Sequence, residues 1–263
     1  MDLGLKDRVA VVAASSQGLG KAVALGLAAE GAKLALCART ESTLSVTARE
    51  IARETGADVL ARPLDVTNYD AVCRFIAEVM SRYGRVDICV ANAGGPPSKT
   101  FAETTVEDWH CAAEMNLMST VYFARETLPL MLQRRWGRFI AITSMTVKQP
   151  VEGLILSNSV RAGVSGLIKS LANEYGPYNV LVNNVCPGYT ATARLISLAG
   201  TLAQKQGVTP QEIEARWAGQ APLGRVGRPG EFADLVVFLA SERASYITGV
   251  SIAVDGGAVK GLY

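Results

Sequence analysis

The chain has 263 residues, of which 49% are hydrophobic and 19% charged, a balance typical of a globular protein and not of a disordered one. With 26 basic and 24 acidic residues and no long run of either sign, the charge pattern gives little support to a nucleic-acid partner. The five cysteines include no CxxC pair, so neither a disulfide framework nor a zinc site is expected, and no metal is assigned. The length fits one large α/β domain over residues 1–263.

The N-terminal stretch MDLGLKDRVAVVAAS does not have the pattern of a secretory leader, because no charged segment precedes a cleavable apolar run. No apolar run in the chain approaches the ~18 residues needed to cross a bilayer. We therefore expect no membrane association and a reducing cytoplasm as the location.

Short apolar runs rich in β-branched residues alternate with segments of helical period. The runs predict strands at 9–14, 33–38, 58–66, 87–92, 139–144, 180–185 and 250–254. The periodic segments include 19–29, 71–82, 106–133 and 160–175. Continuous apolar strands between amphipathic helices favour right-handed crossovers, so we predict a doubly wound (Rossmann) α/β fold. Its seven-stranded parallel sheet should carry helices on both faces.

Ligands bind such sheets outside the carboxyl ends of the strands. The segments that follow the predicted strands are SSQGLG, ARTES, DVT, NAGG, SMT and PGYTAT, and they are the first candidates for function. The segment 191–222 breaks the alternation and contains several Gly and Pro residues, so we expect it to form a helical flap over the site.

The first of these segments leads through Gly18 and Gly20 into a helix whose free amide groups could hold a pyrophosphate. The general G-x-G-x-x-G pattern is absent, so a glycine turn without a ligand stays an alternative. The second strand ends as CARTES without an Asp or Glu for a ribose 2′-hydroxyl, while Arg39 could meet a 2′-phosphate. This favours NADP(H) over NAD(H), unless Arg39 is simply a solvated loop residue.

These segments together resemble the short-chain dehydrogenase/reductase family. AASSQGLG is similar to its T-G-x-x-x-G-x-G turn, with Ala14 at the first glycine, where a positive φ would cost alanine about 1 kcal/mol. LDVT, ANAG, EMNLMS, PGYTAT and YITGVSIAVDGG extend the resemblance along nearly the whole chain. The cofactor-binding residues that it implies are Ala14, Ser16, Gln17, Gly18, Leu19, Gly20, Arg39, Asp65, Val66, Asn92, Ala93, Gly94, Arg161, Pro187, Gly188, Thr190 and Thr192.

Two of the matched polar residues also have structural interpretations. Asp65 resembles the family's adenine-contacting acid, but DVTNYD is also a good helix start, so Asp65 could be a helix cap. Asn116 resembles the asparagine of the family's proton relay. Its position inside a helix favours that role, because asparagine there competes with the backbone.

The family resemblance also implies a catalytic serine, a tyrosine that donates the proton, and a lysine four residues later. Ser144 in AITSMT matches the serine, whereas RAGVSGLIKSLANEYG matches K-A-x-x-x-G-x-x-K-S-L-A-x-E without gaps and places Arg161 at the lysine. Ser157 then stands at the tyrosine, and no other Y-x-x-x-K occurs in the chain. The expected catalytic set is Ser144, Asn116, Ser157 and Arg161.

This set can still stabilise negative charge on a carbonyl oxygen, because Ser144, Ser157 and Arg161 all donate hydrogen bonds. Arg161 should stay cationic and could reach ribose hydroxyls as a lysine would. An aliphatic hydroxyl is a much weaker acid than a phenol, and a missing general acid costs about 10²- to 10⁴-fold in rate. Possible replacement donors are a water held by Ser157 and Asn116, Glu152, or Tyr189, while His110 is expected at the surface.

We therefore expect an NADP-dependent carbonyl reductase for a small carbonyl or alcohol, similar to 3-oxoacyl-[acyl-carrier-protein] reductases; the alternative is a nucleotide-binding scaffold or sensor without hydride transfer. The basic QRRWGR could attract an acidic acyl carrier, or its arginines could simply end a helix. The family resemblance implies a homotetramer formed through the long helices 106–133 and 157–175 and the last strand. An apolar substrate slot is expected from Met145, Val151, Leu154, Leu156, Leu195, Ile196 and Leu198.

Overall fold

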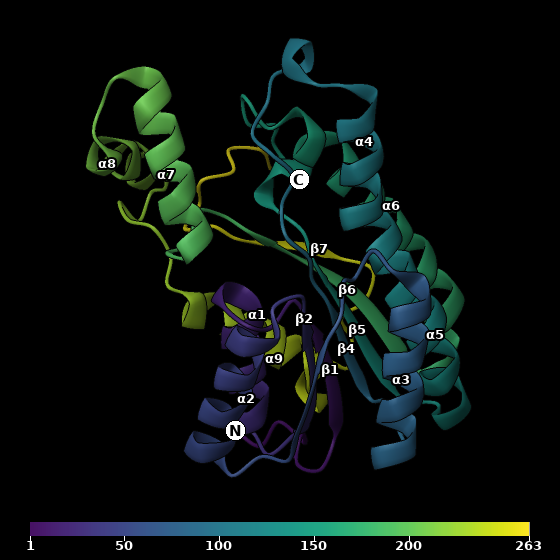
Figure 1. The fold of residues 1–263 in the computed structure, drawn as a ribbon. Coiled ribbons are helices and arrows are strands. Elements are labelled where there is room, and N and C mark those ends of the chain that lie inside the picture. Colours follow the sequence, from purple (N-terminus) through teal and green to yellow (C-terminus); the bar gives the residue numbers. More distant parts are fainter. Residues whose placement is uncertain (263) are drawn as a thin grey trace.

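A computed structural model of the chain, which describes residues 1–262, has a seven-stranded parallel sheet in the order β3-β2-β1-β4-β5-β6-β7 (Figure 1). The predicted doubly wound sheet is confirmed. The strands are β1 (Val9–Ala13), β2 (Lys33–Ala38), β3 (Val59–Pro63), β4 (Ile88–Ala91), β5 (Gly137–Ile142), β6 (Val180–Pro187) and β7 (Ser251–Val254). Strand order reverses between β1 and β4, which is where doubly wound sheets bind their ligands.

Helices cover both faces of the sheet and enclose two separate apolar cores. One core lies under α1 (Gly18–Ala29), α2 (Glu41–Thr55) and α9 (Pro229–Ala240), and the other lies under α3 (Tyr69–Tyr83), α5 (Ser119–Arg134) and α6 (Ile155–Tyr175). Figure 1 shows these two groups of helices on opposite sides of the strands. Burial on both faces explains why the central strands β1 and β4 are apolar throughout rather than alternating.

The long helix predicted for 106–133 is interrupted. Helix α4 (Val106–Ala112) passes into the π-helical turn Ala113–Met118 before α5 begins. Isolated π turns are frequent at functional sites, and this one contains Asn116. Hydrophobic periodicity could not reveal it, because one added residue shifts the pattern only slightly.

The segment predicted as a helical flap forms α7 (Ala193–Gln206) and α8 (Pro210–Gln220). The two helices share a small apolar core of their own, made of Ala199, Ala203, Ile213 and Trp217. In Figure 1 they stand beside the upper end of the sheet, apart from the other helices. No helix within residues 1–262 is both long and apolar enough to span a bilayer.

Candidate active site

Two adjoining cavities lie at the carboxyl ends of the strands. The larger one is about 810 Å³, and the smaller is about 210 Å³. They form one continuous cleft, since both are lined by Leu19, Asn92, Ala93, Thr192 and Arg194. The larger cavity carries the predicted cofactor residues Ala14, Ser16, Gln17, Gly18, Arg39, Asp65, Val66 and Gly94, and the smaller carries Ser144, Ser157, Arg161, Pro187, Gly188 and Thr190.

The turn between β1 and α1 leaves the start of the helix open to an anion. Gln17 precedes the helix without a side-chain cap, so the first amide groups of α1 have no side-chain acceptor there. A Cβ atom at Gly20 would overlap the carbonyl oxygen of Ala14, which explains the glycine. Ala14 itself has a φ of 48°, in the left-handed region that glycine favours.

The outer end of the larger cavity contains Arg39 and Asp65. Arg39 is exposed and forms no ion pair with any residue from 1 to 262, so its guanidinium can accept an anion. Asp65 does not cap α3: its Oδ1 accepts hydrogen bonds from the amide and hydroxyl of Thr67 at 3.0 and 2.9 Å. The cap is Asn68, whose Oδ1 accepts from the amide of Ala71 at 3.0 Å, so the helix-cap interpretation of Asp65 is wrong.

Asn116 and Arg161 meet at one backbone atom. Nδ2 of Asn116 and Nη2 of Arg161 both donate to the carbonyl oxygen of Gly94, at 2.8 and 2.9 Å. Asn116 is buried and lines neither cavity, and its Oδ1 has no hydrogen-bond partner within the described chain. An unpaired acceptor of this kind is costly inside a protein and commonly marks a water site or a functional group.

Arg161 is 7% exposed and is held almost entirely by backbone. Besides the bond to Gly94, Nη1 donates to the carbonyl oxygens of Ile142 and Thr143 at 3.2 and 3.1 Å. Burial, and secondly the charge of Arg194, lower the pKa of Arg161 to about 10, so it remains cationic at neutral pH. Three of its N–H groups are engaged, which leaves fewer donors for a cofactor ribose than the sequence suggests.

Three hydroxyl groups line the same cavity as this guanidinium. Oγ1 of Thr146 lies 3.3 Å from Oγ of Ser157, and the amide of Thr146 donates to Oγ of Ser144 at 3.2 Å. Thr146 links the two predicted serines, and sequence reasoning missed it. Its position two residues after Ser144, in the segment that follows β5, was the available signal.

Of the alternative proton donors, Tyr189 is the one that reaches the smaller cavity. Its ring stacks on Trp217 at 5.0 Å, and burial raises the pKa of its phenol, which makes it a weaker acid than usual. Glu152 lines neither cavity. His110 is exposed, as expected, and lines the larger cavity.

The predicted apolar slot is partly wrong. Met145, Leu154, Leu195 and Leu198 line the smaller cavity. Leu156 is instead fully buried in the protein interior, and Ile196 on α7 is 63% exposed and lines neither cavity. Val151 packs beside Met145 without lining the cavity.

The basic QRRWGR segment lies at the wrong end of the sheet for a carrier that must reach the site. It precedes and begins β5, whereas the cavities lie beyond the strand's carboxyl end. Arg138 is fully buried with its guanidinium over the Trp136 ring at 4.3 Å, so neither is available to a carrier. Arg134 donates to the carbonyl of Gly84, which agrees with a helix-ending role.

A doubly wound sheet with an open phosphate turn after its first strand defines the class of Rossmann-type dinucleotide-binding proteins. A family profile described as Enoyl-(Acyl carrier protein) reductase matches residues 13–259. The 3-oxoacyl-[acyl-carrier-protein] reductase FabG of Aquifex aeolicus is 33% identical over 98% of this chain and 99% of its own. The NADPH-dependent reductase BacG of Bacillus subtilis is 30% identical over 98% of this chain and 100% of its own.

Among solved structures, L-sorbose reductase from Gluconobacter frateurii, complexed with NADPH and L-sorbose, has a TM-score of 0.95 at 35% identity and full coverage of both chains. The chain therefore belongs to the short-chain dehydrogenase/reductase family of oxidoreductases.

Proposed function

We propose that this protein is an NADP-dependent reductase of a small carbonyl compound, with Ser144, Asn116, Ser157 and Arg161 in the catalytic places. The observation that carries the proposal is the convergence of Ser144, Ser157 and Arg161 on one cavity that continues into a dinucleotide-sized cleft. The reductases among its relatives support the reaction class, and 3-oxoacyl thioesters are one candidate substrate.

The cleft fits a dinucleotide on its own geometry. The uncapped N-terminus of α1 suits a pyrophosphate, and the close approach of Gly20 to Ala14 keeps the turn tight. Arg39 would meet a 2′-phosphate, which favours NADPH over NADH. Bound along the cleft, NADPH would supply the hydride.

The chain's own contribution is to hold the carbonyl and stabilise the charge that develops on its oxygen. The hydroxyls of Ser144 and Ser157 donate to this oxygen, and the fixed positive charge of Arg161 lies on the same cavity. Asn116 positions Arg161 indirectly, because both hold the carbonyl of Gly94. Thr146 holds Ser157 in place through the contact between their hydroxyls.

A nucleotide-binding scaffold is the competing function. It is favoured by the engagement of Arg161 with three backbone carbonyls, an arrangement that a purely structural arginine would also adopt. The hydroxyls of Ser144 and Ser157, which line the same cavity as Arg161, favour the enzyme, since a scaffold has no need of hydrogen-bond donors at a substrate cavity.

The two functions are separated by combining NADPH titration, followed by fluorescence, with an NADPH-consumption assay over ketoacyl thioesters, diketones, aldehydes and ketoses. For an enzyme, Ser144→Ala should lower kcat about 10²-fold and leave the NADPH Kd within about twofold. Ser159→Ala, on an exposed position of α6, is the matched control and should change neither value. Tight NADPH binding with no turnover of any compound would instead favour the scaffold.

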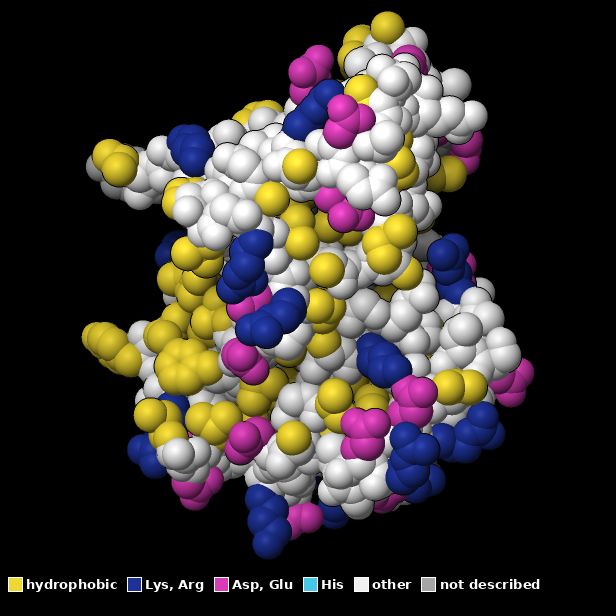
Figure 2. All heavy atoms as spheres, turned by 90° about the vertical axis from the view of Figure 1, so that its left-hand side faces the viewer, with side chains coloured by type: hydrophobic (Ala, Val, Ile, Leu, Met, Phe, Trp, Pro, Cys, Tyr) yellow, Lys and Arg dark blue, Asp and Glu magenta, His cyan; other side chains and the backbone are white. Residues whose placement is uncertain are grey.

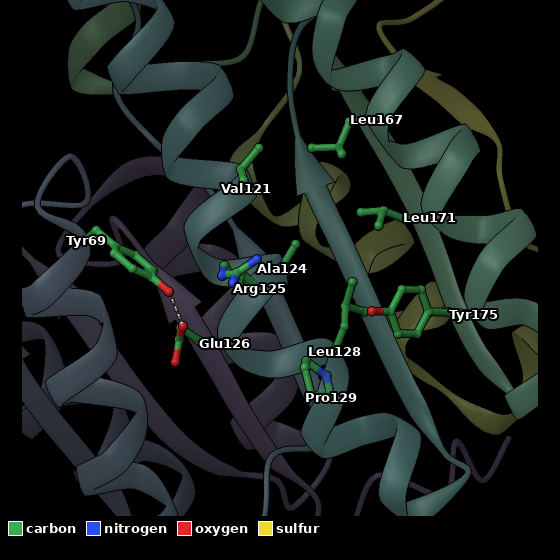
Figure 3. A pocket seen from close by; sticks show the side chains of 10 residues that line it. All are labelled: Tyr69, Val121, Ala124, Arg125, Glu126, Leu128, Pro129, Leu167, Leu171 and Tyr175. Atoms are coloured by element: carbon green, nitrogen blue, oxygen red, sulfur yellow. Dashed lines mark hydrogen bonds between the residues drawn. The ribbon is translucent and has the colours of Figure 1, made fainter.

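We also propose a homotetramer, with α5 and α6 at one interface. A groove of about 540 Å³ runs between these helices and is lined mainly by apolar side chains, among them Leu128, Leu167 and Leu171 (Figure 3). The last strand, β7, is an edge strand that is only partly buried, and Tyr246 near it is fully exposed. Figure 2 views the molecule from the side of α1 and α7, opposite α5 and α6, and shows hydrophobic side chains gathered there, a surface that commonly marks a protein contact.

A further inference from the structure

We propose that Arg194 binds an anionic group on the substrate, so that the preferred substrate is a short keto acid. This inference rests on the proposed reductase function and names the class of its substrate. It arises from a residue that neither the phosphate turn nor the hydroxyl cluster uses.

Arg194 lies in the first turn of α7 and reaches across the cleft toward the segment that follows β4. Its Nη2 donates to the carbonyl oxygen of Pro96 at 2.9 Å. The guanidinium also packs on Gly95, where an added Cβ would come within 2.7 Å of Nη2. Since Arg194 lines both cavities, it stands at their boundary.

The smaller cavity is cationic. Arg161 and Arg194 line it, and no Asp or Glu of residues 1–262 does. Arg194 is exposed and has no carboxylate within ion-pair distance among those residues. A positive cavity that contains no carboxylate favours an anionic occupant.

Arg194 is the arginine that can bind this anion. Arg161 already gives three N–H groups to backbone carbonyls, whereas Arg194 gives one and keeps the others free. An arginine fork of this kind binds a carboxylate with two parallel hydrogen bonds. The contact with Pro96 fixes the side chain in advance, which lowers the cost of binding.

The size of the cavity limits the substrate. Pockets for drug-sized ligands occupy about 300–1,000 Å³, and this cavity is about 210 Å³. A cavity of this size suits a small molecule. Its carbonyl would meet Ser144 and Ser157, and its carboxylate would meet Arg194 on the facing side.

Matched pairs of keto acids and their methyl esters test this directly, because each pair shares a carbonyl and differs in charge. We would compare pyruvate, acetoacetate and levulinate with their esters at saturating NADPH. For at least one pair, kcat/KM should be about 10- to 100-fold higher for the acid, the contribution of one charge-assisted contact. In Arg194→Gln that preference should disappear because KM for the acid rises, while kcat/KM for the ester changes less than twofold.

Two further variants keep the test independent of folding. Arg194→Lys should retain part of the preference, because it keeps the charge. Arg216→Gln, on α8 of the same helical pair, should retain all of it, since that guanidinium bonds to Gln206 and lines neither cavity. Equal or better use of esters by the parent, or an acid preference that survives in Arg194→Gln, would overturn the proposal.

Binding measurements distinguish a failure of the reductase function from a failure of the proposed Arg194 site. If no compound is turned over, the reductase function fails, and calorimetry of the NADPH-loaded protein with the same acids and esters still measures the charge preference. Acid binding that is lost in Arg194→Gln would support the site. Absence of acid-selective binding would overturn it. A weaker NADPH Kd in Arg194→Gln with unchanged acid affinity would assign the arginine to the cofactor's phosphates and contradict the substrate assignment.

Discussion

Alanine at position 14 adopts a backbone conformation that L-residues rarely use, with a φ of 48°. Its carbonyl oxygen also lies close enough to Gly20 to exclude any side chain there. We expect Ala14→Gly to raise the free energy of unfolding by up to about 1 kcal/mol, because it removes the strain at some cost in chain entropy. Urea unfolding would measure this, with Ala22→Gly in the middle of α1 as a control that should destabilise by a similar amount. A destabilised Ala14→Gly would show that the strain is absent.

A substitution of Arg39 tests the proposed preference for NADPH over NADH. Arg39→Ser should weaken NADPH binding about tenfold or more and leave NADH binding nearly unchanged, because only NADPH carries the 2′-phosphate. Fluorescence titration with both cofactors measures the two Kd values. Arg53→Ser, an exposed position on α2 that lines neither cavity, is the control. An equal loss of affinity for NADPH and NADH would argue against a contact between Arg39 and the 2′-phosphate.

At the scale of elements, α7 and α8 form a unit with its own small core around Trp217. Because Tyr189 stacks on Trp217, the packing of this unit reaches the wall of the smaller cavity. Trp217→Ala should therefore raise KM for the substrate and increase proteolytic cleavage within 193–220, while the thermal unfolding temperature of the rest of the fold changes little. Trp217→Phe should preserve most of both properties. Loss of the whole fold in Trp217→Ala would show that the unit is not separate.

The elements also show what the sequence could and could not predict. Apolar runs such as VAVVA and KLALCA predicted their strands almost to the residue, because a strand that is buried on both faces has apolar side chains along nearly its whole length. The π turn at Asn116 and the contacts of Arg161 could not be predicted, since they depend on where distant carbonyls fall. The alignment to the family motifs led us to expect Ser144 and Ser157 in one site, and both line the smaller cavity. The places of Thr146 and Arg194 on this cavity follow only from the fold.

The whole molecule exposes an apolar groove between α5 and α6 that a monomer would leave open to water. Leu171→Arg should lower the mass measured by light scattering from that of a tetramer to that of a smaller assembly, because a charge in this groove would be buried at the interface without a partner. Asn173→Arg, on the other side of the same helix, should leave the mass unchanged. A monomeric parent protein would contradict the proposed assembly.

The family resemblance implies that Ser157 and Arg161 stand in the places of a tyrosine and a lysine, and we expect this exchange to set the chemistry of the protein. Ser157→Tyr combined with Arg161→Lys restores the residues that the family resemblance implies, and Arg161→Lys alone is its control. In a single-turnover NADPH oxidation assay with the best substrate of the parent, the double variant should react about 10² times faster or more, with an NADPH Kd within a few-fold of the parent. A folded double variant that binds NADPH and shows no gain in rate would contradict the account.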